Sequence, residues 1–253
     1  MNGAPVLDMA VVAPIGFAAF GALLVLLGEV WLTRRKHFLG RPATEYFIGV
    51  ALSVLAMLFL GLSVYCAGAA FLEGSTRIFD AANPMLLLDR FGTYSMALIG
   101  VASILVCLLS ISYLAQLHIN HGEFYSLLLL STAGMFLLVG AVDLMAVFLG
   151  LELMSIPLYV LAGFDRRNLR SNESAFKYFL VGSFASAILL YGIALIYGVT
   201  GTLEFAGIQK GFPPGNVATA FSVLISVTAV FASFSVRVIS MGTAIFSSLS
   251  VSP

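Results

Sequence analysis

Long apolar runs separated by short polar segments make up most of the chain. Each run is long enough to cross the hydrocarbon core of a bilayer as a helix, which takes about 20 residues. The runs cover approximately 9–33, 46–71, 91–114, 124–141, 142–164, 174–200 and 217–236. They are continuously apolar rather than alternating, which favours helices over barrel strands. The pattern therefore predicts an all-α, polytopic transmembrane helix bundle with about seven spanning helices.

The composition supports this fold class and narrows the functions. The chain is 60% hydrophobic and 9% charged, with a mean hydropathy of +1.06, which excludes an ordinary soluble globule. The lipid bilayer is therefore the expected surrounding, and the net charge of zero gives no reason to expect a nucleic-acid partner. No phosphate-binding loop is recognisable. His118 and His121 are spaced like a metal-binding pair beside Glu123, but they lie in a short connection where the further ligands of a zinc site are not apparent, which favours a solvated loop. We therefore expect neither a cofactor-binding nor a metal site in this chain.

Basic residues predict the orientation of the bundle. If six helices cross, the segments after the first and fifth runs share a side and carry seven basic residues, against Arg77, Arg90 and Lys210 on the other side. The seven are Arg34, Arg35, Lys36, Arg41, Arg166, Arg167 and Arg170. The positive-inside rule makes the richer side cytoplasmic and places the N-terminus outside.

The fifth run contains the most informative residue of the chain. Glu152 lies near the middle of 142–164, where a carboxylate is costly and normally serves a function. Pro157 lacks the N–H that would bond to the carbonyl four residues earlier. Ser155 and Tyr159 share the face of Glu152, so we expect their hydroxyls beside the acid. The alternative is a buried acid that only holds helices together.

A second charge lies near the start of the sixth run. Lys177 either takes part in proton transfer or extends to the membrane surface. Glu173, four residues earlier, could pair with it. Ser171 or Asn172 is expected to cap this helix.

Two further features concern helix packing and helix ends. The small residues Gly182, Ser183, Ser186 and Ala187 predict a close helix contact without a chemical role. Asp143 is expected at the positive N-terminal end of the preceding helix.

Two strings of this sequence are characteristic of a known family. FLGLELMSIPLYVLAGF (148–164) and SNESAFKYFLVGSFASAILLYGIALIYGVTG (171–201) resemble the antiporter-like membrane subunits of respiratory NADH:quinone oxidoreductase, complex I. The resemblance is closest to the group called subunit N and implies an inverted-repeat fold. It implies proton translocation, with Glu152 matching the essential glutamate of the fifth helix and Lys177 the lysine of the sixth.

The resemblance also implies a setting. The chain would lie in a bacterial inner membrane among other membrane subunits of complex I. NADH, flavin, iron–sulfur clusters and quinone would belong to partner subunits, so this chain would be part of a translocase without holding a redox site. Two alternatives stay open: a subunit of a multi-subunit cation/proton antiporter or membrane-bound hydrogenase, and a structural membrane subunit that conducts nothing.

The sequence divides into three expected regions. Residues 1–123 form an N-terminal three-helix region, 124–216 begin the antiporter-like repeat, and 217–253 form a divergent apolar tail. Family members carry a seventh-helix lysine, whereas the last lysine here is Lys210. We therefore expect a truncated or frame-shifted tail, the alternative being a genuinely divergent short protein.

Overall fold

The computed structural model describes residues 8–39, 43–74, 76–80, 84–116 and 121–211, with the side chains of 33–39 and 43–46 left undescribed. Each of the first six predicted runs forms a helix within these ranges. The helices are α1 (Met9–Leu39), α2 (Ala43–Glu73), α3 (Arg90–Gln116), α4 (Gly122–Gly140), α5 (Leu144–Ala162) and α6 (Leu169–Thr200). All six contain a stretch long and apolar enough to span a membrane. The predicted multi-pass helical fold is confirmed, while the run at 217–236 lies outside the described residues.

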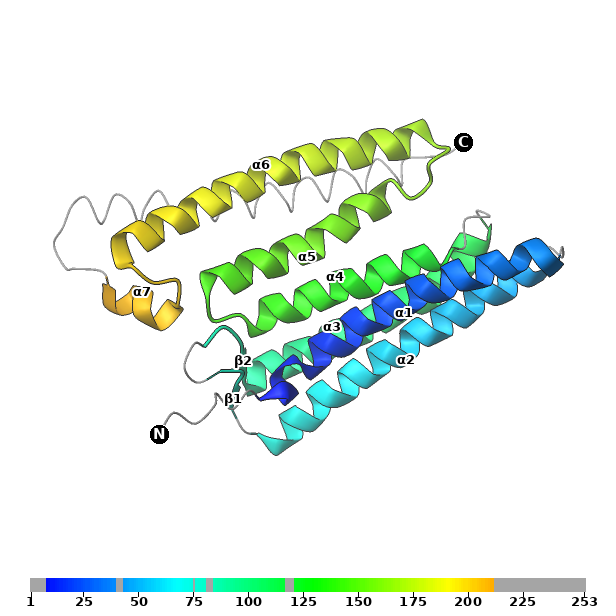
Figure 1. The fold of residues 1–253 in the computed structure, drawn as a ribbon. Coiled ribbons are helices and arrows are strands. Elements are labelled where there is room, and N and C mark those ends of the chain that lie inside the picture. Colours follow the sequence, from blue (N-terminus) through cyan, green and yellow to red (C-terminus); the bar gives the residue numbers. More distant parts are fainter. Residues whose placement is uncertain (1–7, 40–42, 75, 81–83, 117–120, 212–253) are drawn as a thin grey trace.

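Successive helices run in opposite directions between two ends of the bundle (Figure 1). At one end, Arg166 after α5 pairs with Glu123 at the start of α4, with 3.7 Å between Nη2 and Oε2. The rings of Phe124 and Phe164 meet edge to face beside them, 5.6 Å apart. The segments before α4 and after α5 therefore lie at the same end, which we call the Arg166 end.

The opposite end, here the hairpin end, is held together by backbone hydrogen bonds between segments far apart in sequence. The strands β1 (Arg77–Ile78) and β2 (Leu87–Leu88) pair antiparallel between α2 and α3. The amide of Asp8 donates to Phe79 O at 3.1 Å, and the amide of Val142 donates to Met85 O at 3.1 Å. The hairpin thus joins the start of α1 to the turn between α4 and α5.

This end also contains a short helix, α7 (Phe205–Gly211), which follows α6. The amide of Phe205 donates to Val142 O at 3.1 Å, and that of Leu144 donates to Leu203 O at 3.0 Å. The hairpin and α7 lie in segments where the apolar pattern gave only loops.

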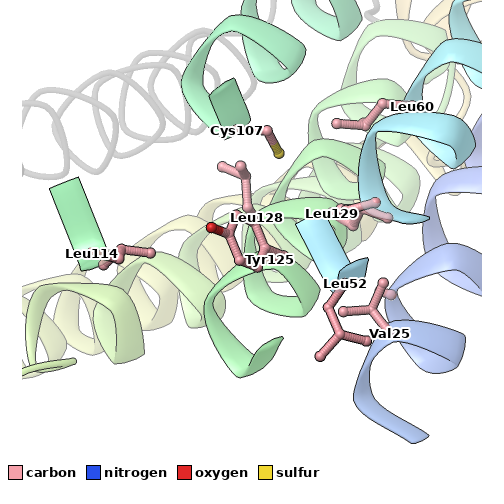
Figure 2. Packing of buried hydrophobic residues seen from close by; sticks show 10 residues of the cluster. Val25, Leu52, Leu60, Cys107, Leu114, Tyr125, Leu128 and Leu129 are labelled. Carbon is pink, nitrogen blue, oxygen red and sulfur yellow. The ribbon is translucent and has the colours of Figure 1, made fainter. Parts of the chain in front are cut away.

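The core of the described structure is built mainly by α1 to α4. One cluster, drawn in Figure 2, packs Tyr125 and Leu129 of α4 against Leu60 of α2 and Cys107 of α3, all fully buried. A second cluster around Phe136 fills the half of the bundle nearer the hairpin end. Helix α4 therefore contacts the first three helices, and it packs against α5 as well.

A carboxylate of α1 also stabilises the start of α4. The N-cap residue His121 makes no side-chain capping bond. Glu29 Oε2 instead accepts the amide of Gly122 at 3.2 Å. An acid at a helix N-terminus satisfies a free N–H group and suits the helix dipole.

Candidate functional site

Helix α5 begins at a well-defined cap. Asp143 is buried, and its Oδ1 accepts the amides of Met145 at 2.7 Å and Ala146 at 3.3 Å. A carboxylate that accepts bonds from the first turn satisfies amides that have no partner inside the helix. The expected position of Asp143 at the start of its helix is confirmed, and the cap fixes where along α5 each later residue falls.

Glu152 lies eight residues into α5, close to the middle of this 19-residue helix. Its side chain is half-buried and meets α6, where Ser186 donates its hydroxyl to Glu152 Oε1 at 2.5 Å. The acid therefore lies at the α5–α6 contact with a polar partner from the neighbouring helix.

The two hydroxyls expected beside the acid have other recorded contacts. Ser155 is buried and donates to Leu151 O on its own helix at 2.5 Å. Tyr159 is also buried, and its ring contacts α6 about two turns before Ser186. It lies edge to face with Tyr178, with 4.6 Å between the ring centroids, and packs against Phe179. Their roles as supporting residues stay predictions.

Ser186 was missed as a polar partner. The sequence pattern placed it in a stripe of small residues and gave it only a packing role. The stripe does mediate packing, since a Cβ at Gly182 would overlap the Tyr159 hydroxyl. The available signal was that Ser186 lies one helical turn after Gly182, on the face that α6 turns toward α5.

The turn of α5 that contains Pro157 packs closely on α4. Pro157 has no N–H to offer Leu153 O. At this level Gly134 of α4 lies directly against the backbone, and a Cβ there would overlap Met154 N and Leu153 C. Ser131, also on α4, donates to Met154 O at 3.2 Å. This turn of α5 is thus packed closely against α4, which also donates a hydrogen bond to the adjacent carbonyl of Met154.

Lys177 lies on a different side of α6. Its Nζ is 2.5 Å from Glu173 Oε1, and the two side chains are 70% and 58% exposed. The expected pairing with Glu173 is confirmed. Nine residues separate Lys177 from Ser186, which is two and a half turns, or about 13.5 Å along the axis. The described geometry therefore gives Glu152 and Lys177 separate partners and does not bring them together.

The predicted cap of the sixth helix is wrong. Helix α6 begins at Leu169, and Asn168 is its N-cap, accepting the amide of Arg170 at 3.0 Å. Ser171 instead donates to Ala162 O at 2.8 Å and Asn172 to Arg166 O at 3.0 Å. The helix starts earlier than its apolar run, because Asn168 satisfies the first turn before the apolar pattern begins. Lys177 is consequently two turns into the helix rather than one.

Much of the chain is similar to known protein sequences. Residues 141–243 match the family described as NADH:quinone oxidoreductase/Mrp antiporter, TM. NADH-quinone oxidoreductase subunit N 1 of Sorangium cellulosum is 41% identical over 212 residues, which cover 83% of this chain and 41% of the relative. Subunit N of Trichlorobacter lovleyi is 45% identical over 149 residues, covering 59% and 31%. The chain thus spans about two fifths of the length of the first of these relatives.

Solved structures share the fold. A chain of respiratory complex I from Thermus thermophilus aligns with a TM-score of 0.57 at 24% identity, over 90% of this chain and 52% of that one. A chain of the Mrp complex from Dietzia aligns with a TM-score of 0.61 at 21% identity, over 90% and 45%. The antiporter-like membrane fold expected from the sequence is confirmed.

Proposed function

Because the chain belongs to the antiporter-like membrane family that includes the N subunits of NADH-quinone oxidoreductases, we propose that it is a membrane subunit of a proton-pumping NADH:quinone oxidoreductase. Its role would be to carry protons across the bilayer while partner subunits transfer electrons from NADH to quinone. The other membrane subunits of the complex are its proposed partners.

The observation that carries this proposal is the place of Glu152. A carboxylate in the middle of a spanning helix is expensive unless it titrates, pairs or meets water, and such residues mark proton pathways. Glu152 also lies at a helix contact, where Ser186 provides a hydroxyl at 2.5 Å. We propose that Glu152 binds and releases the transported proton, and that Lys177 is a second charge of the same pathway.

Replacing Glu152 with glutamine tests the proposal. The amide keeps the shape of the side chain and can still bond to Ser186, but it cannot take up a proton. In membranes that contain the assembled complex, we expect Glu152→Gln to lower proton pumping at least tenfold at matched electron-transfer capacity. Pumping is measured as acidification of inverted vesicles. Normal pumping by an assembled mutant complex would leave only the structural, non-conducting alternative.

A cation/proton antiporter is the second candidate, because the matched family and one of the similar folds include Mrp antiporters. The curated relatives named above favour the oxidoreductase. Affinity purification of the chain from its native membrane separates the two: flavin and iron–sulfur subunits accompany a complex I subunit, and their absence supports the antiporter.

We further propose that this chain holds no redox centre. NADH, flavin, iron–sulfur clusters and quinone would be bound by partner subunits. The proposal that partner subunits bind these groups is supported by the sequence, which contains no recognisable nucleotide-binding motif. The same affinity-purified complex tests it: the chain separated from its partners should show no flavin or iron–sulfur absorbance.

For orientation, we propose a bacterial inner membrane with the Arg166 end cytoplasmic and the N-terminus outside, following the excess of basic residues. Arg167 and Ile78 are both exposed and belong to opposite ends. An impermeant thiol reagent added to intact cells should label Ile78→Cys and leave Arg167→Cys unlabelled, with the parent chain as background. Labelling of Arg167→Cys alone would reverse the orientation.

A further inference from the structure

The hydroxyl of Ser186 lies between two oxygen atoms that belong to different helices. Glu152 Oε1 of α5 is 2.5 Å away, and Gly182 O on the preceding turn of α6 is 3.0 Å away. A serine hydroxyl has one proton and two lone pairs, and it rotates to suit its surroundings. It can therefore donate to one of these oxygens at a time while accepting from another group.

We propose that Ser186 is a positioning residue that keeps Glu152 hydrogen-bonded in both of its protonation states. This inference rests on the proposed function, in which Glu152 takes up and releases a proton. When Glu152 is ionised, Ser186 donates to its carboxylate. When Glu152 is protonated, the carboxyl O–H donates to Ser186 Oγ, and the serine proton turns to Gly182 O. Serine neither gains nor loses a proton, since the added proton stays on Glu152.

The surroundings hold the two acceptors at a fixed separation. Gly182 is buried, and its lack of a side chain admits the Tyr159 hydroxyl to the α6 backbone. The ring of Tyr159 in turn packs against the rings of Tyr178 and Phe179. The α6 turn that carries the Gly182 carbonyl is thus packed against Tyr159 of α5, seven residues after Glu152, and only the hydroxyl needs to move.

The energetic reason is the cost of an unmatched polar group in the membrane. Inside a bilayer no bulk water is present to replace a lost hydrogen bond, so an unsatisfied polar group is strongly unfavourable. A fixed donor, such as a backbone N–H, would suit the carboxylate but not a carboxyl O–H directed toward it. A hydroxyl with a second acceptor within reach can bond to Glu152 in both protonation states. Neither state is then left with an unsatisfied polar group.

Three variants separate this role from plain packing. Ser186→Ala removes the hydroxyl, and Ser186→Thr retains it. Ser183→Ala is the matched control, because Ser183 is exposed on the same helix and its recorded bond, 2.8 Å to Phe179 O, is to α6 itself. Each variant is examined in the assembled complex by infrared difference spectroscopy across the titration, and by the ratio of protons pumped to electrons transferred.

The carboxyl C=O band that disappears in Glu152→Gln identifies the acid. We expect Ser186→Ala to move this band to higher frequency and to lower the pumping ratio several-fold. Ser186→Thr should restore both properties toward the wild type, and Ser183→Ala should change neither. Should Ser186→Ala fail to assemble, Ser186→Cys, a weaker donor, should give an intermediate band shift.

An unchanged carboxyl band in assembled Ser186→Ala, or in Ser186→Cys if that variant is needed, would overturn the assignment. This outcome differs from failure of the proposed function, which would appear as normal pumping by Glu152→Gln. The infrared band reports the contact between Ser186 and Glu152 even in a complex that does not pump.

Discussion

The packing of α4 differs sharply from that of α6, although both are apolar enough to span a membrane. In α4, eleven of 19 residues are buried, and they point to several sides of the helix. In α6, seven of 32 are buried, and they follow one stripe: Ser174, Tyr178, Gly182, Ala185, Leu189, Gly192 and Ile193. The spanning window of α4 is nevertheless the least hydrophobic of the six. Apolarity therefore marks a spanning helix without telling whether its neighbours are protein or lipid.

The polar groups of the two regions differ in the same way. Between α3 and α4, Ser103 and Thr132 share a buried hydrogen bond of 3.0 Å, and Ser126 of α4 donates to Ala22 O of α1 at 2.8 Å. These neutral hydroxyls join helices and carry no titratable proton at physiological pH. At the α5–α6 contact the partner of a hydroxyl is a carboxyl group. The densely packed part thus suits a scaffold, and the titratable acid lies at a contact with fewer buried neighbours.

The largest effect is expected from a single methyl group placed between α4 and α5. Alanine stabilises a helix by about 1 kcal/mol over glycine. Gly134→Ala should nevertheless lower the free energy of unfolding by about 2 kcal/mol, because overpacking outweighs that gain. Its Cβ would overlap the backbone of Leu153 and Met154, which cannot rotate away. The apparent Tm of the detergent-solubilised complex measures the change.

The matched control is Gly198→Ala on α6, where a Cβ meets nothing within 4 Å. This substitution should leave the apparent Tm unchanged or raise it slightly, since only helix propensity acts. Equal apparent Tm values for Gly134→Ala and Gly198→Ala would contradict the difference in packing between α4 and α6. A lower Tm for Gly198→Ala alone would show that α6 is the more tightly packed helix.

The length and composition of the runs were enough to predict the six helices, because a spanning helix satisfies its backbone internally and needs only an apolar surface. Asp143 was predicted for a similarly local reason, since a cap acts within one turn. The hairpin of β1 and β2 could not be predicted in this way. Its backbone bonds reach Asp8 and Val142, residues distant in sequence that only the folded bundle brings together.

The site was predictable in part for the same reason. Glu152 stood out because a charge in an apolar run is unusual, whereas Ser186 looked like one small residue among several. The bond between them depends on how α5 and α6 are rotated against each other, and tertiary packing decides that rotation. The helix cap at Asn168 was missed for a different reason. A cap is a local feature, but this one precedes the apolar run from which the helix was predicted.

The smallest structural effect is expected at the Lys177–Glu173 pair. Both side chains are largely exposed and lie one turn apart on α6, and exposed pairs of this kind contribute little to stability. Neither Lys177→Met nor Glu173→Gln should change the apparent Tm of the complex measurably.

The effects of these two substitutions on proton pumping should differ, however, because only Lys177→Met removes the positive charge proposed for the pathway. We expect Lys177→Met to lower pumping, by less than Glu152→Gln does, and Glu173→Gln to keep most of it. Equal pumping by Lys177→Met and the wild type would reduce Lys177 to a surface charge and leave Glu152 as the titrating group proposed for the described helices.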